Sequence, residues 1–230
     1  MTSTKADFYR RVLEINTYFD FLRLTDATPS SINYTDPLLG TIANEPVSDD
    51  LRKILKANGF LLLYNLVEST VSKSLTAIFN KITDEGLQFA DLSDTFRKLW
   101  INDRGSDLKG IESLNLNKIR TLMRDVAESI LATEIASLSK NCISISGNID
   151  AQEIRKIASQ VGFDSIEDGR HLVTIKNKRN QLAHGELSFT DIGKDYSFNE
   201  LVVFKDDTIS FLNLMMQKIE LFITGRKYAA

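Results

Sequence analysis

The stretch between residues 49 and 82 constrains the fold more than any other part of the sequence. Ser48, Asp49 and Asp50 supply a capping hydroxyl and two acidic residues at its start, as is typical of a helix N-terminus. Its centre, F-L-L-L-Y at residues 60–64, is apolar on nearly every side. A helix that is apolar all round is buried among other elements. The sequence therefore predicts a long helix inside a bundle.

Six further stretches have the apolar spacing or the capping residues of helices. They cover residues 5–25, 89–102, 113–138, 150–159, 166–184 and 199–224. In the stretch 113–138 the side chains expected to face inward are Leu116, Ile119, Leu122, Met123, Val126 and Ile130. No repeat or linker divides the chain. We therefore expect one all-α domain over residues 1–230, an irregular helical bundle with additional short helices and room for a minor hairpin.

Three stretches lack helical spacing. Residues 26–48 hold all three prolines and predict a long loop, which would cover a site or a partner surface, or be mere decoration. Residues 143–147 alternate (I-S-I-S-G) and predict a short strand or an extended segment. The segment after Gly185 predicts irregular or weakly hairpin-like structure.

Charge and cysteine content narrow the classes of function. A formal net charge of −3 argues against a protein that coats nucleic acid with its whole surface. Cys142 is the only cysteine, so neither an intrachain disulfide nor a thiolate metal cluster is expected. With two histidines and no H-x-x-x-H spacing, we expect no metal and no cofactor. No apolar run reaches the roughly 18–20 residues of a membrane span, and the N-terminus does not resemble a signal peptide, so we expect a cytoplasmic protein without membrane association.

The stretch 170–185, R-H-L-V-T-I-K-N-K-R-N-Q-L-A-H-G, carries an unusual amount of polarity for a structural helix. Gly185 predicts its end, because glycine permits the left-handed C-terminal cap. The apolar face consists of Leu172, Ile175, Leu182 and Ala183. Arg179 falls in the middle of that face, and a buried guanidinium needs a carboxylate, a phosphate or an interface as its partner.

The other face of this helix stacks Lys176, Asn180 and His184 at intervals of four. Between residues 170 and 184 four side chains are basic and none is acidic: Arg170, Lys176, Lys178 and Arg179. A small basic site on an acidic chain is typical of an enzyme that binds a few phosphates. His171 is interpreted as structural.

The hexapeptide R-N-Q-L-A-H, residues 179–184, resembles the Arg-x4-His signature of the HEPN superfamily. Two longer phrases, N-G-F-L-L-L-Y-N-L-V-E-S-T-V at 58–71 and I-K-N-K-R-N-Q-L-A-H-G at 175–185, resemble the MAE-type HEPN subfamily. The resemblance covers nearly the whole chain and implies a helical bundle of HEPN type.

The resemblance also implies an activity. Many HEPN domains are metal-independent endoribonucleases of toxin–antitoxin or anti-phage systems, in which two motifs meet at a homodimer cleft. Carried over, Arg179 would stabilise charge on the phosphate, His184 would act as acid and base, and Asn180 would bind the phosphate or position the imidazole. Lys176 and Lys178 would steer the substrate, an RNA such as tRNA or mRNA. An antitoxin protein would be a further partner.

Geometry adds a constraint to this interpretation. Residues five apart on a regular helix diverge by about 140°. Arg179 and His184 therefore meet at one atom only if the last turn unwinds, if the Arg side chain swings round, or if a two-fold dimer brings two helix ends together.

Two alternatives stay open. Glu68, on a polar stripe with Asn65, Ser69 and Ser72, either belongs to a solvated face or orients Arg179 as a supporting carboxylate. The motif itself either catalyses or serves a non-catalytic module that dimerises or binds nucleotide or a partner protein. HEPN toxins silenced by adenylylation carry Tyr two residues after the His, whereas this sequence has Glu186, so that regulation is not carried over.

Overall fold

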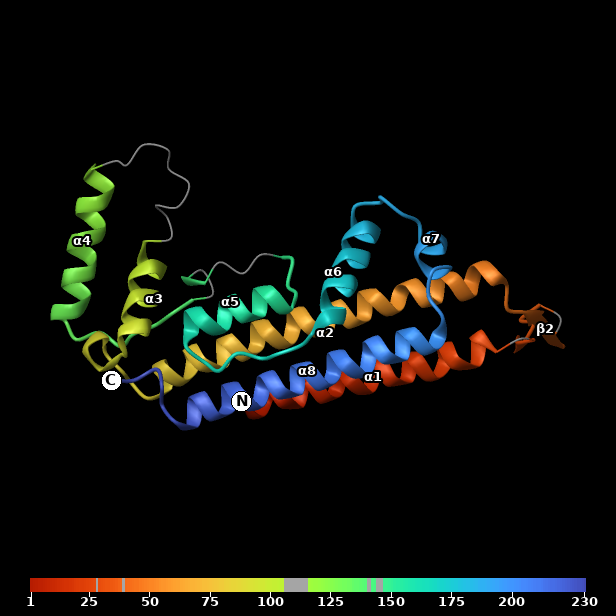
Figure 1. The fold of residues 1–230 in the computed structure, drawn as a ribbon, viewed down its shortest axis with the longest axis horizontal. Helices are drawn as coiled ribbons and strands as arrows, with labels where there is room; N and C mark the ends of the chain where they lie inside the picture. Colours follow the sequence, from red (N-terminus) through yellow and green to blue (C-terminus); the bar gives the residue numbers. More distant parts are fainter. Residues whose placement is uncertain (28, 39, 106–115, 140–141, 144–146) are drawn as a thin grey trace. The chain divides into compact units, whose positions relative to one another are not determined.

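A computed structural model describes the chain except residues 28, 39, 106–115, 140–141 and 144–146. Over the described residues the structure is mostly helical, as predicted (Figure 1). The helices are α1 (Thr2–Asp26), α2 (Asp49–Asp84), the 3-10 helix η1 (Phe89–Asp91), α3 (Asp94–Arg104), α4 (Leu116–Leu131), α5 (Ala151–Val161), α6 (Arg170–Ala183), α7 (Phe189–Gly193) and α8 (Phe198–Thr224). The strands are β1 (Ser31–Thr35) and β2 (Ile42–Pro46).

The chain packs as two compact units. The motif unit, as we call it, comprises Ala6–Val67 and Gly169–Phe211. The second unit comprises Met1–Lys5, Glu68–Asp168 and Leu212–Ala230. The expectation of one domain over residues 1–230 stays a prediction.

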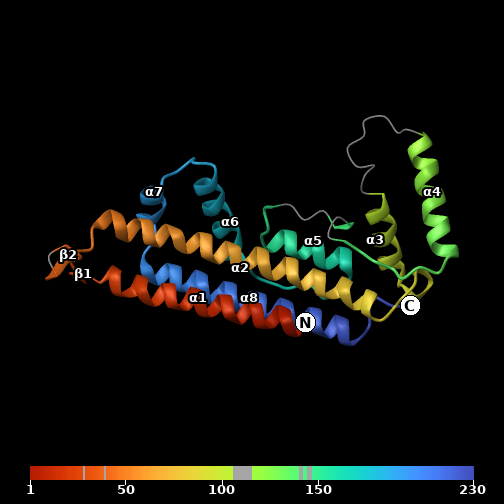
Figure 2. The same cartoon turned by 180° about the vertical axis from the view of Figure 1, so that it is seen from behind.

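In the motif unit, α1, α2 and α8 pack against one another (Figures 1 and 2). The Tyr18 hydroxyl of α1 donates a hydrogen bond to the carbonyl oxygen of Leu55 on α2. The Phe60 ring of α2 lies 5.9 Å from that of Phe204 on α8. Lys205 of α8 donates to the side-chain oxygen of Asn16 on α1 at 3.2 Å. The apolar centre of α2 thus packs beside α1 and α8, with Phe60, Leu63 and Tyr64 buried and Leu61 and Leu62 half-buried.

The N-terminus of α2 forms as the sequence predicts. The Leu51 backbone N–H donates to the Ser48 hydroxyl at 3.2 Å. Asp49 and Asp50 lie in the first turn, where acidic side chains are favoured by the helix dipole.

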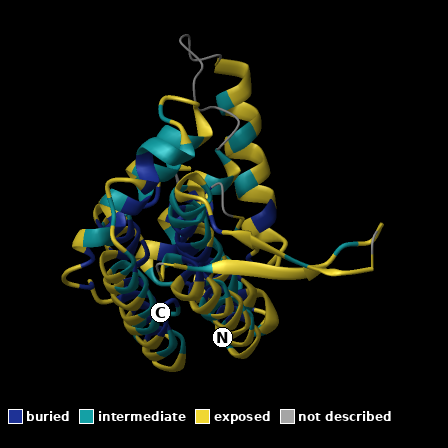
Figure 3. Ribbon diagram, turned by 90° about the vertical axis from the view of Figure 1, so that its right-hand side faces the viewer, coloured by how far each residue is buried: buried dark blue, intermediate teal, exposed yellow. Residues whose placement is uncertain are grey.

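The stretch 26–48, predicted as a long loop, contains the minor hairpin that the fold expectation allowed for. β1 and β2 form an antiparallel hairpin in which Ser31 pairs with Pro46 and Thr35 with Ile42. Figure 3 shows that the strands are exposed along nearly all their length. β1 (S-I-N-Y-T) does alternate polar and apolar residues, whereas β2 (I-A-N-E-P) does not, so the sequence signal for a pair of strands is incomplete.

The segment after Gly185 differs from the expectation as well. Instead of an irregular or hairpin-like segment it forms α7, whose start is a capping box. The Ser188 hydroxyl accepts from the Asp191 N–H at 3.1 Å, and the Asp191 carboxylate accepts from the Ser188 N–H at 3.4 Å.

In the second unit, the helix expected at 150–159 is α5, Ala151–Val161, which begins after Asp150 and ends before Gly162. Asp150 accepts from the Glu153 N–H at 2.9 Å, and Gly162 follows the helix with a left-handed φ of 94°. The chain after α8 returns to the start of α3, where Ser93 N–H donates to the Tyr228 carbonyl oxygen at 2.9 Å.

The inward face predicted for residues 113–138 is only partly covered. Leu116, Met123 and Ile130 of α4 are exposed, with 66%, 68% and 36% of their surface accessible. The amphipathic pattern specifies an apolar face but not what covers it. The neighbouring residues 113–115, and most of the alternating stretch 143–147, lie outside the described residues.

Candidate functional site

The motif helix α6 ends in the cap that glycine at position 185 predicts. Gly185 has a φ of 68°. Its N–H donates to the Leu182 carbonyl at 3.2 Å, and the Glu186 N–H donates to the Gln181 carbonyl at 2.9 Å. This pair of bonds is the Schellman motif, in which the two residues after the last helical position satisfy the free carbonyls of the final turn. His184 is the C-cap residue and its side chain is exposed.

The last turn of α6 does not unwind. The helix is continuous from Arg170 to Ala183, and His184 keeps right-handed angles of φ −90° and ψ −2°. Its N–H donates to the Asn180 carbonyl at 2.9 Å. Arg179 and His184 therefore leave the helix about 140° apart within one chain. Of the three ways to bring them together, the unwound turn is excluded.

Leu172 and Ile175 of the predicted apolar face are buried, and Leu182 is half-buried. Ala183 is exposed, so the apolar face is shorter than predicted. The final turn of α6 therefore extends beyond the core, and its capping residues are exposed to solvent.

Arg179 lies half-buried against the ring of Tyr64 on α2. The guanidinium carbon is 3.7 Å from the ring centroid, and the Arg179 Nε is fully buried. Tyr64 itself is 1% exposed. Sequence reasoning expected a carboxylate, a phosphate or an interface beside Arg179 and missed this aromatic contact. The only signal was the tyrosine at the end of the apolar run of α2.

The neighbouring Lys178 also lies over an aromatic ring. Its ammonium is 5.7 Å from the centroid of Tyr196, which packs edge-on against Phe60 at 4.9 Å. Burial, and then the nearby carboxylates of Asp195 and Glu200, raise the pKa of Tyr196. Its phenol therefore stays neutral at physiological pH. Lys176, one turn before Asn180, is half-buried.

Asn180 is half-buried and its side-chain oxygen is fully enclosed. On α6 it lies one turn before His184, as the spacing predicted. Its side chain is thus held in place at the base of the turn that carries the histidine. The roles of Asn180, Arg179 and His184 toward a substrate stay predictions.

The other histidine belongs to the packing of α6. His171 Nε2 lies 3.1 Å from the Asp207 carboxylate, and its ring is 4.6 Å from that of Phe204. Both partners are on α8. This arrangement agrees with the structural interpretation of His171, since it joins the start of α6 to the core of the motif unit.

Glu68 is exposed on α2. It falls in the second unit, whereas Arg179 falls in the motif unit. The proposed orientation of Arg179 by Glu68 stays a prediction.

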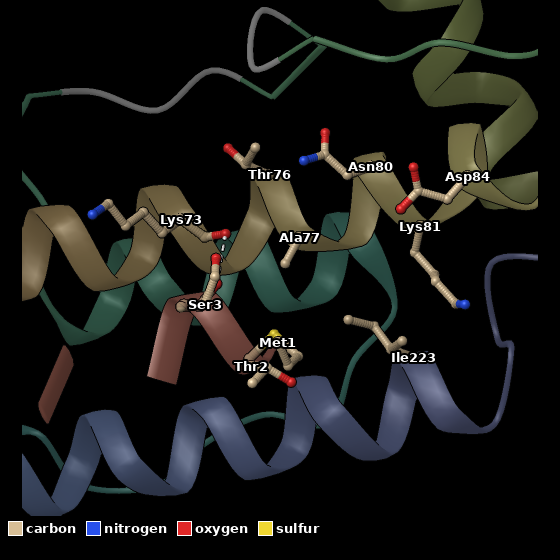
Figure 4. Close-up of a pocket in the computed structure, with 11 residues that line it drawn as sticks. Met1, Thr2, Ser3, Lys73, Thr76, Ala77, Asn80, Lys81, Asp84 and Ile223 are labelled. Atoms are coloured by element: carbon tan, nitrogen blue, oxygen red, sulfur yellow. Dashed lines mark hydrogen bonds between the residues drawn. The ribbon is translucent and has the colours of Figure 1, made fainter. Parts of the chain in front are cut away.

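The second unit has a surface pocket of about 610 Å³ at the start of α1 (Figure 4). Side chains of the second half of α2, including Lys73, Lys81 and Asp84, line it together with Thr2. None of the predicted site residues is among its lining residues.

The described residues contain neither a helix suited to crossing a membrane nor a cluster of metal-ligating side chains. None of the described helices combines the length and the apolar character required to cross a membrane. Within the same described residues, no three His, Cys, Asp or Glu side chains gather as metal ligands would.

Comparison with known proteins supplies the family. Neither curated proteins nor solved structures give a match to this chain. The family model HEPN_MAE_28990, which describes an MAE_28990-like HEPN domain, matches residues 2–228. That match includes α6, its Schellman cap and the core of both units. The chain therefore belongs to the MAE_28990-like HEPN family.

Proposed function

We propose that this protein is a metal-independent endoribonuclease of a toxin–antitoxin or anti-phage system, with a composite site at a homodimer interface. The observation that carries the proposal is the end of α6 in a HEPN family member. There an exposed His184 is the C-cap residue, one turn after a half-buried Asn180 and close in sequence to an Arg179 that lies over an aromatic ring. HEPN domains typically dimerise and bind RNA, which supports the same interpretation.

The reaction is an internal phosphoryl transfer. One His184 takes the proton of the ribose 2′-OH, and the 2′-oxygen attacks the adjacent phosphorus. The bond to the 5′-oxygen breaks, and this oxygen receives a proton from the second His184. The products are a 2′,3′-cyclic phosphate and a free 5′-OH. Each chain supplies one motif histidine, so a dimer supplies the acid and the base.

The remaining motif residues have distinct roles in this scheme. Arg179 donates hydrogen bonds to the phosphoryl oxygens as their charge grows, a task suited to its planar donors. Asn180 binds the phosphate or positions the imidazole. Lys176 and Lys178 attract the RNA backbone and take no part in the proton transfers.

A second function has its own supporting observation. The regular last turn of α6 keeps Arg179 and His184 about 140° apart in a single chain. A helix end of this kind also suits a non-catalytic module that dimerises or binds nucleotide or a partner protein in a defence operon.

Cleavage of purified total RNA and tRNA in EDTA separates the two functions. We expect wild type to cut RNA, and Arg179→Ala and His184→Ala each to lower the rate at least about 100-fold, the scale of acid–base and electrostatic contributions. Arg120→Ala, which removes an exposed arginine of α4, is the matched control and should cut at the wild-type rate.

Two further readouts complete the test. The products should carry 2′,3′-cyclic phosphate ends, and a deoxy substrate should resist cleavage. A folded, dimeric wild type that leaves RNA intact would remove the ribonuclease proposal and favour the binding module. If the protein cleaves RNA, its expression should arrest growth, and this arrest should depend on Arg179 and His184. If it is a binding module, no such dependence is expected.

A further inference from the structure

The contact between Arg179 and Tyr64 is the tightest cation–π contact of the described residues. Its 3.7 Å separation compares with 4.6 Å for Arg104 over Trp100 and 5.7 Å for Lys178 over Tyr196. The remaining two, made by Lys205 and Arg97, measure 5.6 and 5.9 Å. At 3.7 Å the guanidinium carbon is in van der Waals contact with the ring, directly above its centre.

Tyr64 is a rigid support for this contact. It is 1% exposed and lies in the apolar centre of α2, next to Leu63, which is fully buried. A ring held in a close-packed core has little freedom to turn. The ring face that the guanidinium contacts is therefore fixed by the core of the motif unit.

The chemistry of stacking suits an arginine that must bind a phosphate. A guanidinium places its five N–H donors in one plane, so a ring against its face leaves the donors at its edge directed elsewhere. The ring is neutral and does not cancel the positive charge, as a carboxylate would. It also restricts the rotamers of a long side chain that otherwise loses conformational entropy when it binds.

We propose that Tyr64 is the positioning residue of the site, holding the guanidinium of Arg179 at the position from which it binds the reacting phosphate. The proposal rests on the proposed function and adds to it a residue of α2, outside the Arg-x4-His motif. Tyr64 acts through Arg179 and does not itself touch the substrate.

The test compares two replacements of one ring. Tyr64→Phe keeps the aromatic face, whereas Tyr64→Leu fills the core with an apolar side chain that has no such face. We expect kcat for RNA cleavage to fall about 10- to 30-fold in Tyr64→Leu with KM changed less than about three-fold, because the contact matters most when charge develops on the phosphate. Tyr64→Phe should stay within about three-fold of wild type in kcat.

Controls separate positioning from folding. Thermal unfolding and dimer mass are measured for each variant, and Tyr64→Met replaces Tyr64→Leu if the latter does not fold. Wild-type kcat in the ringless variant, or an equal loss in Tyr64→Phe and Tyr64→Leu, would overturn the proposal.

The same assay distinguishes this proposal from the function on which it rests. If Arg179→Ala abolishes cleavage while the ringless variant cleaves normally, only the role of Tyr64 is wrong. If wild type does not cleave RNA, the proposed function fails and the role of Tyr64 fails with it.

Discussion

Among the described glycines, Gly193 is the one at which an added Cβ would lie closest to another part of the chain. A Cβ at this position would lie 1.9 Å from the Lys53 carbonyl oxygen and 2.5 Å from its carbonyl carbon. Real Cβ atoms do not approach a backbone this closely, so α7 would have to move away from α2. Glycine is required here by contact and not by an unusual φ.

We therefore expect Gly193→Ala to lower the free energy of unfolding by about 1–3 kcal/mol or more, the usual range for overpacking. Urea denaturation followed by circular dichroism measures the loss. Gly147→Ala is the matched control, since a Cβ there meets nothing within 4 Å and should change stability by less than about 0.5 kcal/mol. Equal stability of the two variants would contradict the close packing of α7 on α2.

At the scale of the element, the cap of α6 makes a separate prediction. Gly185 holds a φ of 68°, where an L side chain costs roughly 1–2 kcal/mol. Gly185→Ala should lower the free energy of unfolding by about 1 kcal/mol, whereas Gly185→Asn should lose less, because asparagine adopts the left-handed conformation more readily. Thermal unfolding of the two variants checks this order. A larger loss in the asparagine variant would argue against the left-handed cap.

The boundaries of the long helices were predictable from the sequence. The helix expected at 49–82 is α2, Asp49–Asp84, and the one expected at 199–224 is α8, Phe198–Thr224. Ser48 marks the first boundary by accepting a backbone hydrogen bond. The sequence Ser188-x-x-Asp191 also fits a capping box. The helix that follows it, α7, is only 5 residues long and was therefore not recognised.

The hairpin and the surroundings of the site were less predictable, for different physical reasons. β1 alternates polar and apolar residues, but it is only five residues long and its partner β2 carries no such pattern, so the hairpin was not identified. The periodicity of α6 identified Arg179 as an arginine in need of a partner. It could not identify Tyr64, because residues 68–168 lie between Tyr64 and Arg179 in the sequence, and only the folded chain brings the two side chains together.

At the scale of the whole molecule, the proposed composite site predicts how subunits behave when mixed. If each site needs His184 from both chains, a heterodimer of wild type and His184→Ala has no complete acid–base pair. Activity should then fall as the square of the wild-type fraction in co-expressed, co-purified mixtures. A site within one chain would instead lose activity in linear proportion. Mixtures with Arg120→Ala, an exposed control, should lose none.

The order in which the chain is made bears on this activity. The motif unit joins residues 6–67 to residues 169–211, so a growing chain that ends before α8 has no completed core on which α6 can pack. The second unit likewise needs residues 212–230 in addition to its central part. Neither unit can finish folding early in synthesis. The proposed ribonuclease activity would therefore arise only after α8 has been synthesised, because α6 has no completed core to pack on before that point.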